Sequence, residues 1–172
     1  MNADELRALQ QPLKSEYKEN PASAQVTLSS TGQLNVARLV CGLDTHAGAI
    51  EAGLHPKAGG DGTLACSGDM LLEALVGCAG VTLSAVATAM SIEITEGSIA
   101  AEGDMDFRGT LGIDRETAIG FERIRLRFNL SSPAEQAQLE KLVQLTERYC
   151  VVYQTLRGGV EMSSELNLNP SK

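Results

Sequence analysis

The sequence predicts an α+β fold, and three patterns along its 172 residues carry that prediction. Residues 69–90 are apolar on nearly every side, residues 119–130 alternate apolar with basic side chains, and residues 132–135 form a helix-start signal. Alternation with a period of two is typical of an antiparallel strand with one wet face. The expected elements follow one another as strands, a buried helix, a strand pair, a helix and a last strand. This order is typical of an α+β fold.

The first segment, residues 3–19, predicts a surface helix, because it is polar and contains spaced leucines. Pro12 should interrupt this helix, since proline removes a hydrogen bond from a helix interior, and Asn20-Pro21 should end it. We therefore divide the chain into an N-terminal helical arm, residues 1–21, and one domain, residues 22–172.

Three short strands are expected next, at residues 24–28, 34–41 and 45–52. Small polar residues and Gly42 provide the breaks between them. Residues 53–68 contain five glycines and a proline, which predicts a loop. The glycines of this loop are not followed by the Lys-Ser/Thr of a phosphate-binding loop, so we interpret them as a turn.

The apolar segment, residues 69–90, has no polar face, so it either spans a membrane or is buried in protein. Its length is close to the roughly 20 residues that a bilayer requires. However, acidic residues stand at both ends (Asp69 and Glu73, then Glu93 and Glu96), and no lysine or arginine flanks it. We therefore expect a central buried helix and no membrane partner.

The C-terminal half predicts two long strands, 92–109 and 119–130, and then a helix and a last strand. Ser132-Pro133-Ala134-Glu135 is a capping box with proline at the first helical position. One helix is expected to run from this box to Gly158-Gly159, which can end it. Residues 160–168 alternate apolar with polar side chains, interrupted at Ser164, and predict the final strand.

Charge and composition exclude several classes of partner. Fourteen basic against twenty-two acidic residues give a net charge of −8, and aromatic residues make up only 3% of the chain. Such a chain repels phosphate backbones and has few rings to stack on bases, so we expect no nucleic acid. The N-terminus lacks the basic and apolar regions of a secretory signal, which makes the cytosol the expected compartment.

The four cysteines are Cys41, Cys66, Cys78 and Cys150, and cytosolic thiols are mostly reduced. No Cys-x-x-Cys pair occurs and only two histidines are present, so the spacing of a zinc site is missing. We expect neither a metal nor a cofactor. We interpret Cys41 and Cys66 as packing residues, because neither has a partner that the pattern can place.

Cys78 and Cys150 fall on core-facing sides of the two predicted helices, so helix packing can bring their sulfurs together. Gly77 and Gly80 flank Cys78, and each glycine costs about 1 kcal/mol in a helix interior, so a close approach by a partner helix or a substrate is expected. A purely space-filling role for both thiols stays open, because cysteine is among the most buried residue types. Cys78 lies too far into its helix for that helix's dipole to lower its pKa, so a cation must activate it.

Three runs of residues resemble the OsmC/Ohr family (osmotically inducible protein C-like, organic hydroperoxide resistance-like). The run DMLLEALVGCAGVTL, residues 69–83, is similar to the family's cysteine helix. GFERIRLRF, residues 120–128, is similar to its long strand, and ERYCVVYQTL, residues 147–156, to its second cysteine motif. The resemblance covers roughly residues 24–168 and makes residues 22–172 an OsmC-like domain.

This resemblance implies an intertwined homodimer, with antiparallel sheets around two central helices and sites at the subunit interface. It also implies peroxidase chemistry in oxidative stress defence. The Cys78 thiolate would attack an organic hydroperoxide and become a sulfenic acid, and Cys150 would condense with it to a disulfide. An external dithiol reductant would then restore both thiols.

The family's activating residues are an arginine from the N-terminal strands and a glutamate ten residues before the reactive cysteine. Arg38 is the candidate arginine. The alternative interpretation is that Arg38 is an ordinary exposed charge on a strand. Position 68 is Gly, so Glu73 is retained as a candidate acid although it does not hold the family's place. The proline that usually follows the second cysteine is Val151, which predicts a helix running through Cys150.

A second function stays open beside the peroxidase. In it, the same dimer binds an apolar small molecule or senses redox state, and the thiols have no catalytic role.

Overall fold

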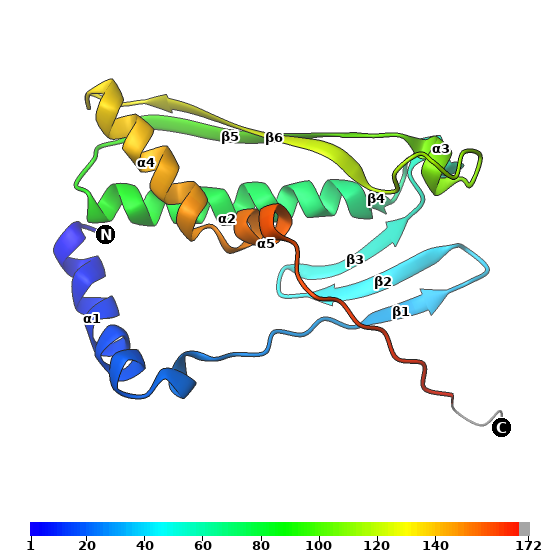
Figure 1. The fold of residues 1–172 in the computed structure, drawn as a ribbon, viewed down its shortest axis with the longest axis horizontal. Helices are drawn as coiled ribbons and strands as arrows, with labels where there is room; N and C mark the ends of the chain where they lie inside the picture. Colours follow the sequence, from blue (N-terminus) through cyan, green and yellow to red (C-terminus); the bar gives the residue numbers. More distant parts are fainter. Residues whose placement is uncertain (169–172) are drawn as a thin grey trace.

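The computed structural model describes residues 1–168 and confirms the α+β class (Figure 1). A four-stranded sheet has the order β1-β2-β3-β4, and a two-stranded sheet pairs β5 with β6. The helices and strands, in chain order, are α1 (Ala3–Glu19), η1 (Pro21–Ala24), β1 (Gly32–Asn35), β2 (Val40–Thr45), β3 (Gly48–Gly53), η2 (Pro56–Ala58), β4 (Ala65–Cys66), α2 (Ser67–Ala89), β5 (Glu96–Met105), α3 (Phe107–Thr110), β6 (Phe121–Ser131), α4 (Gln136–Tyr149) and α5 (Val151–Gly158).

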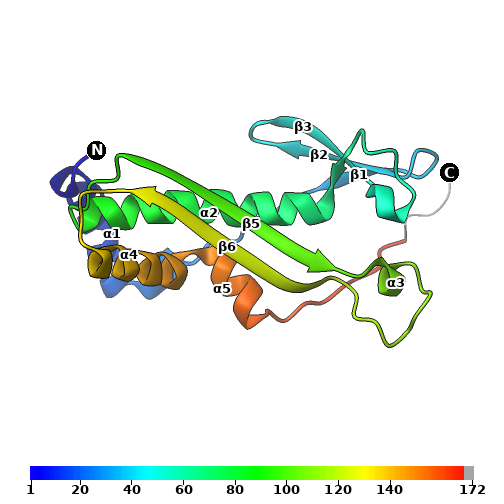
Figure 2. The ribbon, with the colours of Figure 1, turned by 90° about the horizontal axis from the view of Figure 1, so that it is seen from above.

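The long apolar helix α2 forms the axis of the molecule, and its prediction is confirmed to within two residues. Strands β5 and β6 cross over one side of α2, as seen from above in Figure 2, while α4 and α5 pack against another. The buried side chains on α2 recur every four residues, which is the spacing of one helix face. They are Leu75, Ala79, Leu83 and Ala87.

The expectation that α2 is wholly buried is wrong for a single chain. Gly77 and Ser84 are exposed, and the side chain of Val81 between them is 74% exposed. Within one chain the β5–β6 sheet and helices α1, α4 and α5 contact α2, and these leave one side open. By length and apolar composition α2 would suffice to cross a membrane, as would the core helix of many soluble proteins.

The predicted strand pair is confirmed as an antiparallel sheet, β5–β6. Ile99 pairs with Phe128, and both side chains face α2 within the core. The outer face carries ion pairs between the strands, Arg127 with Glu102 and Arg125 with Asp104. One face is therefore apolar and the other charged, as the alternation predicts.

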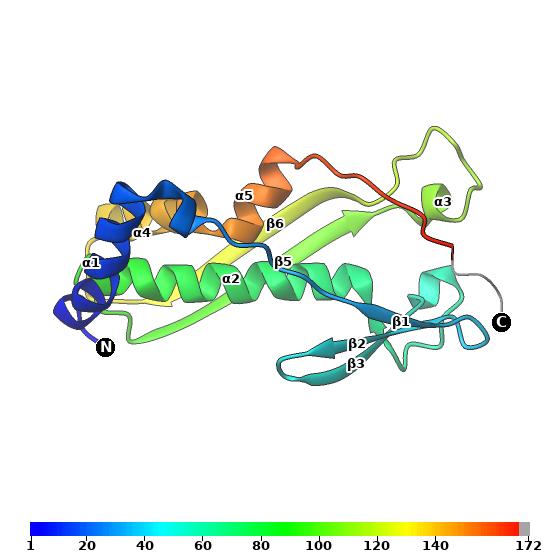
Figure 3. The same ribbon diagram turned by 90° about the horizontal axis from the view of Figure 1, so that it is seen from below.

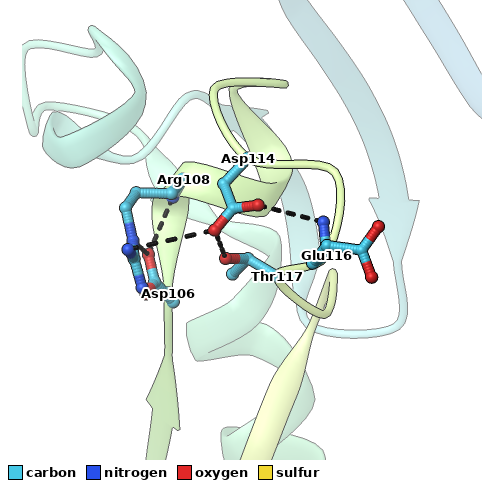
Figure 4. A network of polar contacts seen from close by, with 5 residues as sticks. All are labelled: Asp106, Arg108, Asp114, Glu116 and Thr117. Atoms are coloured by element: carbon cyan, nitrogen blue, oxygen red, sulfur yellow. Dashed lines mark hydrogen bonds and ion pairs between the residues drawn. The ribbon is translucent and has the colours of Figure 1, made fainter.

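The connection between β5 and β6 is a folded loop, so the expectation of a strand to residue 109 is wrong. Asp106 caps the short helix α3 by accepting from the amide of Arg108, at 2.9 Å (Figure 4). Asp114 accepts from the hydroxyl of Thr117 at 2.8 Å and from the amide of Glu116 at 3.0 Å. These local hydrogen bonds satisfy backbone groups outside the ladder, which ends β5 early.

The N-terminal strands differ from their predictions in three places. Gly42, expected at a break between strands, lies inside β2, and the break before β3 falls at residues 46–47. Residues 24–28 form no strand, and the chain leads from η1 to β1 as irregular, exposed backbone (Figure 3). The predicted strand 34–41 is broken by a turn, in which the Asn35 side chain accepts from the amide of Arg38 at 3.1 Å. Asparagine side chains favour such turns. The result is a hairpin, β1 with β2, in place of one strand.

The N-terminal arm is helical, but its predicted interruption at Pro12 is wrong, because α1 continues to Glu19. Pro12 removes a hydrogen bond from the interior of α1, which destabilises the helix. A capping box between Asn2 and Glu5 stabilises the same helix at its start and offsets part of this loss. The boundary of the arm at residue 21 stays a prediction.

The helix-start signal at residues 132–135 is also displaced in the structure. The α4 capping box joins Glu135 to Gln138, so the helix begins at Gln136. Ser132 instead accepts from the amide of Ala134 and donates to the carbonyl of Glu93. Its hydroxyl therefore fastens the end of β6 to the loop after α2.

The predicted final strand, residues 160–168, is irregular and exposed, so that prediction is wrong for a single chain. Its apolar side chains lie outside the core; Val160 is 62% exposed and Met162 is 87% exposed. A strand is stable only when another strand accepts its backbone hydrogen bonds, and this segment pairs with neither sheet.

Candidate active site

The structure brings Cys78 and Cys150 together. Cys78 lies in the middle of α2, Cys150 lies between α4 and α5, and both pack in one apolar cluster with Leu75 and Ala79. Both thiols are free, and they lie close enough for each to shift the pKa of the other. Cys150 is fully buried whereas Cys78 is only partly buried, so Cys78 is the more accessible thiol of the pair.

The chain breaks its helix at Cys150, so the expectation of a helix running through this residue is wrong. The Cys150 backbone is extended, with φ −72° and ψ 110°. Its amide closes α4 by donating to the Thr146 carbonyl at 2.9 Å, while its sulfur opens α5 by accepting from the Tyr153 amide at 3.4 Å. Across the break, the Gln154 side chain donates to the Glu147 carbonyl at 2.8 Å. Side-chain capping therefore restarts the helix without a proline.

The restarted helix directs its first amides at Cys78. Burial acts to raise the pKa of this thiol, but hydrogen bonds from the Val152 amide, the Cys150 thiol and the Val151 amide bring the pKa below its usual value. Free amides at a helix start carry partial positive charge, which stabilises a thiolate. The start of α5 thus lowers the pKa of Cys78, an effect that the sequence analysis assigned to a cation alone.

The pKa of Cys150 is shifted in the opposite direction. Burial raises it, the Tyr153 amide opposes that shift, and the neighbouring Cys78 thiolate raises the pKa further. A thiolate attracts the proton of the adjacent thiol and repels a second negative charge. The pair therefore holds one acidic thiol, Cys78, and one neutral hydrogen-bond donor, Cys150.

The surroundings of the pair are apolar. Partly buried side chains from both strands of the β5–β6 sheet and from α5 pack around the two sulfurs. Next to them lies a cavity of about 410 Å³ between β6 and α5, with Leu75, Tyr153 and Leu156 shared between its wall and the cysteine cluster. Arg123 and Arg157 line the same cavity together with Glu122 and Glu147, so its wall carries charges of both signs.

Arg38 and Glu73, the other two candidates, have different surroundings in the single chain. Arg38 lies in the turn between β1 and β2 and pairs with Glu51 of β3 through two hydrogen bonds, of 2.8 and 2.9 Å. The hydrogen bond from Arg38 is the largest cause of a lowered pKa for the Glu51 carboxyl. Glu73 is exposed on α2, five residues before Cys78 and so about 140° around the helix from it.

The remaining cysteines do not form a second pair. Cys41 of β2 lies opposite Ala52, and Cys66 of β4 lies opposite Gly53, so strand β3 separates them. Since neighbouring residues of a strand point to opposite faces, the two thiols also face different sides of the sheet.

Sequence reasoning missed the backbone groups of this site. The amides of Val151, Val152 and Tyr153 act whatever side chain they carry, so no residue type marks them. The one available signal was the missing proline at position 151, because a non-proline residue retains its amide hydrogen.

Comparisons with known proteins agree with this architecture. The family model described as OsmC-like protein matches residues 60–165. An OsmC-like protein from Mycoplasma pneumoniae superposes with a TM-score of 0.65 at 20% identity, covering 78% of this chain and 90% of its own. An organic hydroperoxide resistance protein OsmC from Legionella pneumophila gives 0.61 at 16% identity, covering 80% and 95%. OhrB of Bacillus subtilis, an organic hydroperoxide resistance protein, gives 0.54 at 19% identity, covering 79% and 94%.

No curated protein matches the sequence. Identities at this level show a shared fold, and the family model covers well over half of the chain. The chain therefore belongs to the OsmC-like protein family.

Proposed function

We propose that this protein is a cysteine-based peroxidase that reduces organic hydroperoxides. The observation that carries the proposal is the contact between Cys78 and Cys150, two free thiols whose pKa values are shifted in opposite directions. Peroxide reduction needs a thiolate at neutral pH and a second thiol within reach. The apolar surroundings favour an organic substrate over hydrogen peroxide.

The proposed cycle has three steps. The Cys78 thiolate attacks the outer oxygen of ROOH, the O–O bond breaks, and the alkoxide leaves and takes up a proton to become ROH. The Cys150 thiol then loses its proton and attacks the sulfur of the Cys78 sulfenic acid. The disulfide forms, and the sulfenic hydroxyl leaves with that proton as water. An external dithiol returns two electrons and two protons, so both cysteines become thiols again and the dithiol becomes a disulfide.

We further propose that the working unit is a homodimer. The open side of α2, around Gly77 and Val81, would pack on the second copy, since small residues allow helices to approach closely. The hairpin that carries the Arg38–Glu51 pair would then extend over the partner's site. In this arrangement Arg38 adds a positive charge to the amides of α5, and Glu73 stays at the edge of the site.

The direct experiment measures consumption of cumene hydroperoxide with dithiothreitol as the reductant. The wild-type protein should turn over, Cys78→Ser should lose the activity, and Cys150→Ser should accumulate a sulfenic acid that dimedone traps. Cys41→Ser is the matched control, because this thiol lies on the other sheet. Equal consumption by wild type and Cys78→Ser would refute the peroxidase.

The contribution of Arg38 across the dimer has its own experiment. Arg38→Ala and Cys78→Ser chains, carrying different tags, are produced together so that mixed dimers form. Each variant alone should be nearly inactive, and the mixed dimer should regain activity because one of its two sites is intact. A mixed dimer as inactive as its parents would contradict the shared site, and a fully active Arg38→Ala protein would remove Arg38 from it.

A second candidate function is the binding of an apolar small molecule. A cavity of about 520 Å³ between α2 and β5, lined by Leu83, Ile92 and Ile99, favours it. A fluorescent apolar probe that bound equally to wild type and Cys78→Ser, together with no hydroperoxide consumption, would support this function over the peroxidase.

A further inference from the structure

The cap of α5 uses the same sulfur that the proposed reaction consumes. In the reduced protein the Cys150 sulfur accepts from the Tyr153 amide at 3.4 Å, which satisfies one of the amides that a helix start leaves unpaired. A disulfide to Cys78 requires the same sulfur to lie about 2.05 Å from its partner sulfur. One atom therefore has two alternative partners, an amide of α5 and a cysteine of α2.

We propose that oxidation of the pair releases the first turn of α5, which makes this helix a redox-sensitive switch. The Cys78–Cys150 disulfide draws the Cys150 sulfur away from the Tyr153 amide, and the uncapped turn opens beside the new bond. The inference rests on the proposed function for its oxidant. The hydroperoxide takes up the two electrons and two protons that the thiols lose, and becomes an alcohol and water.

Cys150 is the cysteine of the pair that can move. Cys78 lies within α2, a helix of 23 residues that packs along the β5–β6 sheet. Cys150 lies at the break between α4 and α5, where its own backbone is extended. Formation of the bond therefore shifts the helix break and leaves α2 in place.

The first turn of α5 has little else to hold it. The helix has eight residues, fewer than the roughly 12–15 that an isolated helix needs for stability. It lies at the edge of the molecule, none of its residues is fully buried, and the side chain of Val151 is 71% exposed (Figure 3). The Gln154 side chain donates to the Glu147 carbonyl at 2.8 Å and involves neither sulfur, so it retains the second turn while the first opens.

The charge on Cys78 acts in the same direction as the cap. The amides of Val151 and Val152 lower the pKa of this thiol, so its thiolate in return stabilises the turn that presents them. A disulfide sulfur carries no charge, and oxidation removes this stabilisation. Both losses fall on one turn of helix.

Release of this turn gives access to a bond that is otherwise covered. Cys150 is fully buried in the reduced protein. An external dithiol must nevertheless attack one of the two sulfurs to reduce the disulfide. Because the turn opens only after the bond has formed, the disulfide is exposed to the reductant while the reduced pair stays covered.

The test measures amide hydrogen exchange by mass spectrometry on the full chain, reduced with dithiothreitol or oxidised with diamide. The N=N bond of diamide accepts the two electrons and two protons, so the disulfide forms without any hydroperoxide. Exchange in residues 151–155 should become about fivefold faster on oxidation, the factor that corresponds to loss of one helix cap. Residues 137–146 of α4 should not change.

Two variants at Cys150 separate the cap from the disulfide. Cys150→Ala has no cap and should exchange fast in residues 151–155 without an oxidant. Cys150→Ser keeps a capping side chain and should exchange slowly with or without diamide. Cys41→Ser is the matched control and should respond to diamide as the wild type does.

The comparison of reduced with oxidised wild type needs no variant to fold, and its outcomes separate the two proposals. A mapped Cys78–Cys150 disulfide with unchanged exchange in residues 151–155 would overturn the switch and leave the peroxidase standing. Faster exchange in a protein that consumes no hydroperoxide would refute only the peroxidase. If diamide forms no Cys78–Cys150 disulfide, both proposals fail.

Discussion

The sulfur of Cys150 accepts a hydrogen bond from the amide of Tyr153, with nitrogen and sulfur 3.4 Å apart. The residue that would resolve the sulfenic acid is therefore also the cap of helix α5. Because the first amides of α5 in turn lower the pKa of Cys78, the cap that Cys150 makes positions the groups that favour the Cys78 thiolate.

Replacing Cys150 by alanine should destabilise α5 as well as stop disulfide formation. Loss of a helix cap costs about 1 kcal/mol, and removal of a fully buried side chain adds to that. We expect the free energy of unfolding to fall by about 2 kcal/mol in urea titrations. The matched variant Cys66→Ala removes a partly buried thiol that makes no side-chain cap, and should cost less. Equal losses for the two variants would contradict the capping role.

Alkylation at neutral pH should select Cys78 from the pair. Its pKa is lowered, so its thiolate is populated at pH values below the usual thiol pKa of about 8.5, whereas the raised pKa of Cys150 keeps that residue protonated. The labelling rate of Cys78 should fall only when the pH drops through its lowered pKa. Peptide mapping after brief iodoacetamide treatment measures the selectivity, and faster labelling of Cys150 would contradict the assignment.

Leu142 should be one of the most sensitive core positions outside the cysteine pair. This side chain of α4 is fully buried against Leu83 and Ile92. Leu142→Ala should lower the free energy of unfolding by about 2–5 kcal/mol, the range for a buried leucine. Leu9→Ala, at a leucine of α1 that is 62% exposed, should change it by less than about 0.5 kcal/mol. Comparable effects at the two positions would show that the core lies elsewhere.

A charge on the open side of α2 should separate the proposed dimer. Val81→Glu places a carboxylate where the second copy would pack, and burying an unpaired charge is strongly unfavourable. Analytical ultracentrifugation should show a dimer for the wild type and a monomer for this variant. Ala137→Glu, on the exposed surface of α4, is the control and should remain a dimer. A Val81→Glu protein that dimerises as well as the wild type would place the interface elsewhere.

Regular elements that pack within one chain could be predicted from the sequence. The α2 helix and the β5–β6 pair follow from hydrophobic spacing, because each buries a face against other parts of the same chain. The irregular residues 160–168 have a strand pattern but no neighbouring strand in the structure, so the pattern alone did not decide the outcome. Local turn chemistry at Asn35 and Asp106 likewise overrode longer predicted strands.

The candidate site could be predicted only in part, and for a physical reason. Cys78 and Cys150 can be recognised in the sequence by residue type, and the hydrophobic spacing places both on core-facing sides of helices. Their proximity could therefore be predicted. The activating groups are backbone amides, and their position depends on where α4 stops and α5 begins. That break depends on the cap that Cys150 makes, which becomes visible only in three dimensions.

The central claim is that Cys78 and Cys150 form a redox pair, and thiol counting after oxidation tests it most directly. One equivalent of cumene hydroperoxide is added to the reduced protein, free thiols are counted, and the disulfide is located by peptide mapping. We predict rapid loss of two thiols, a single Cys78–Cys150 disulfide, and no such loss in Cys78→Ser. Slow oxidation spread over all four cysteines would contradict the account.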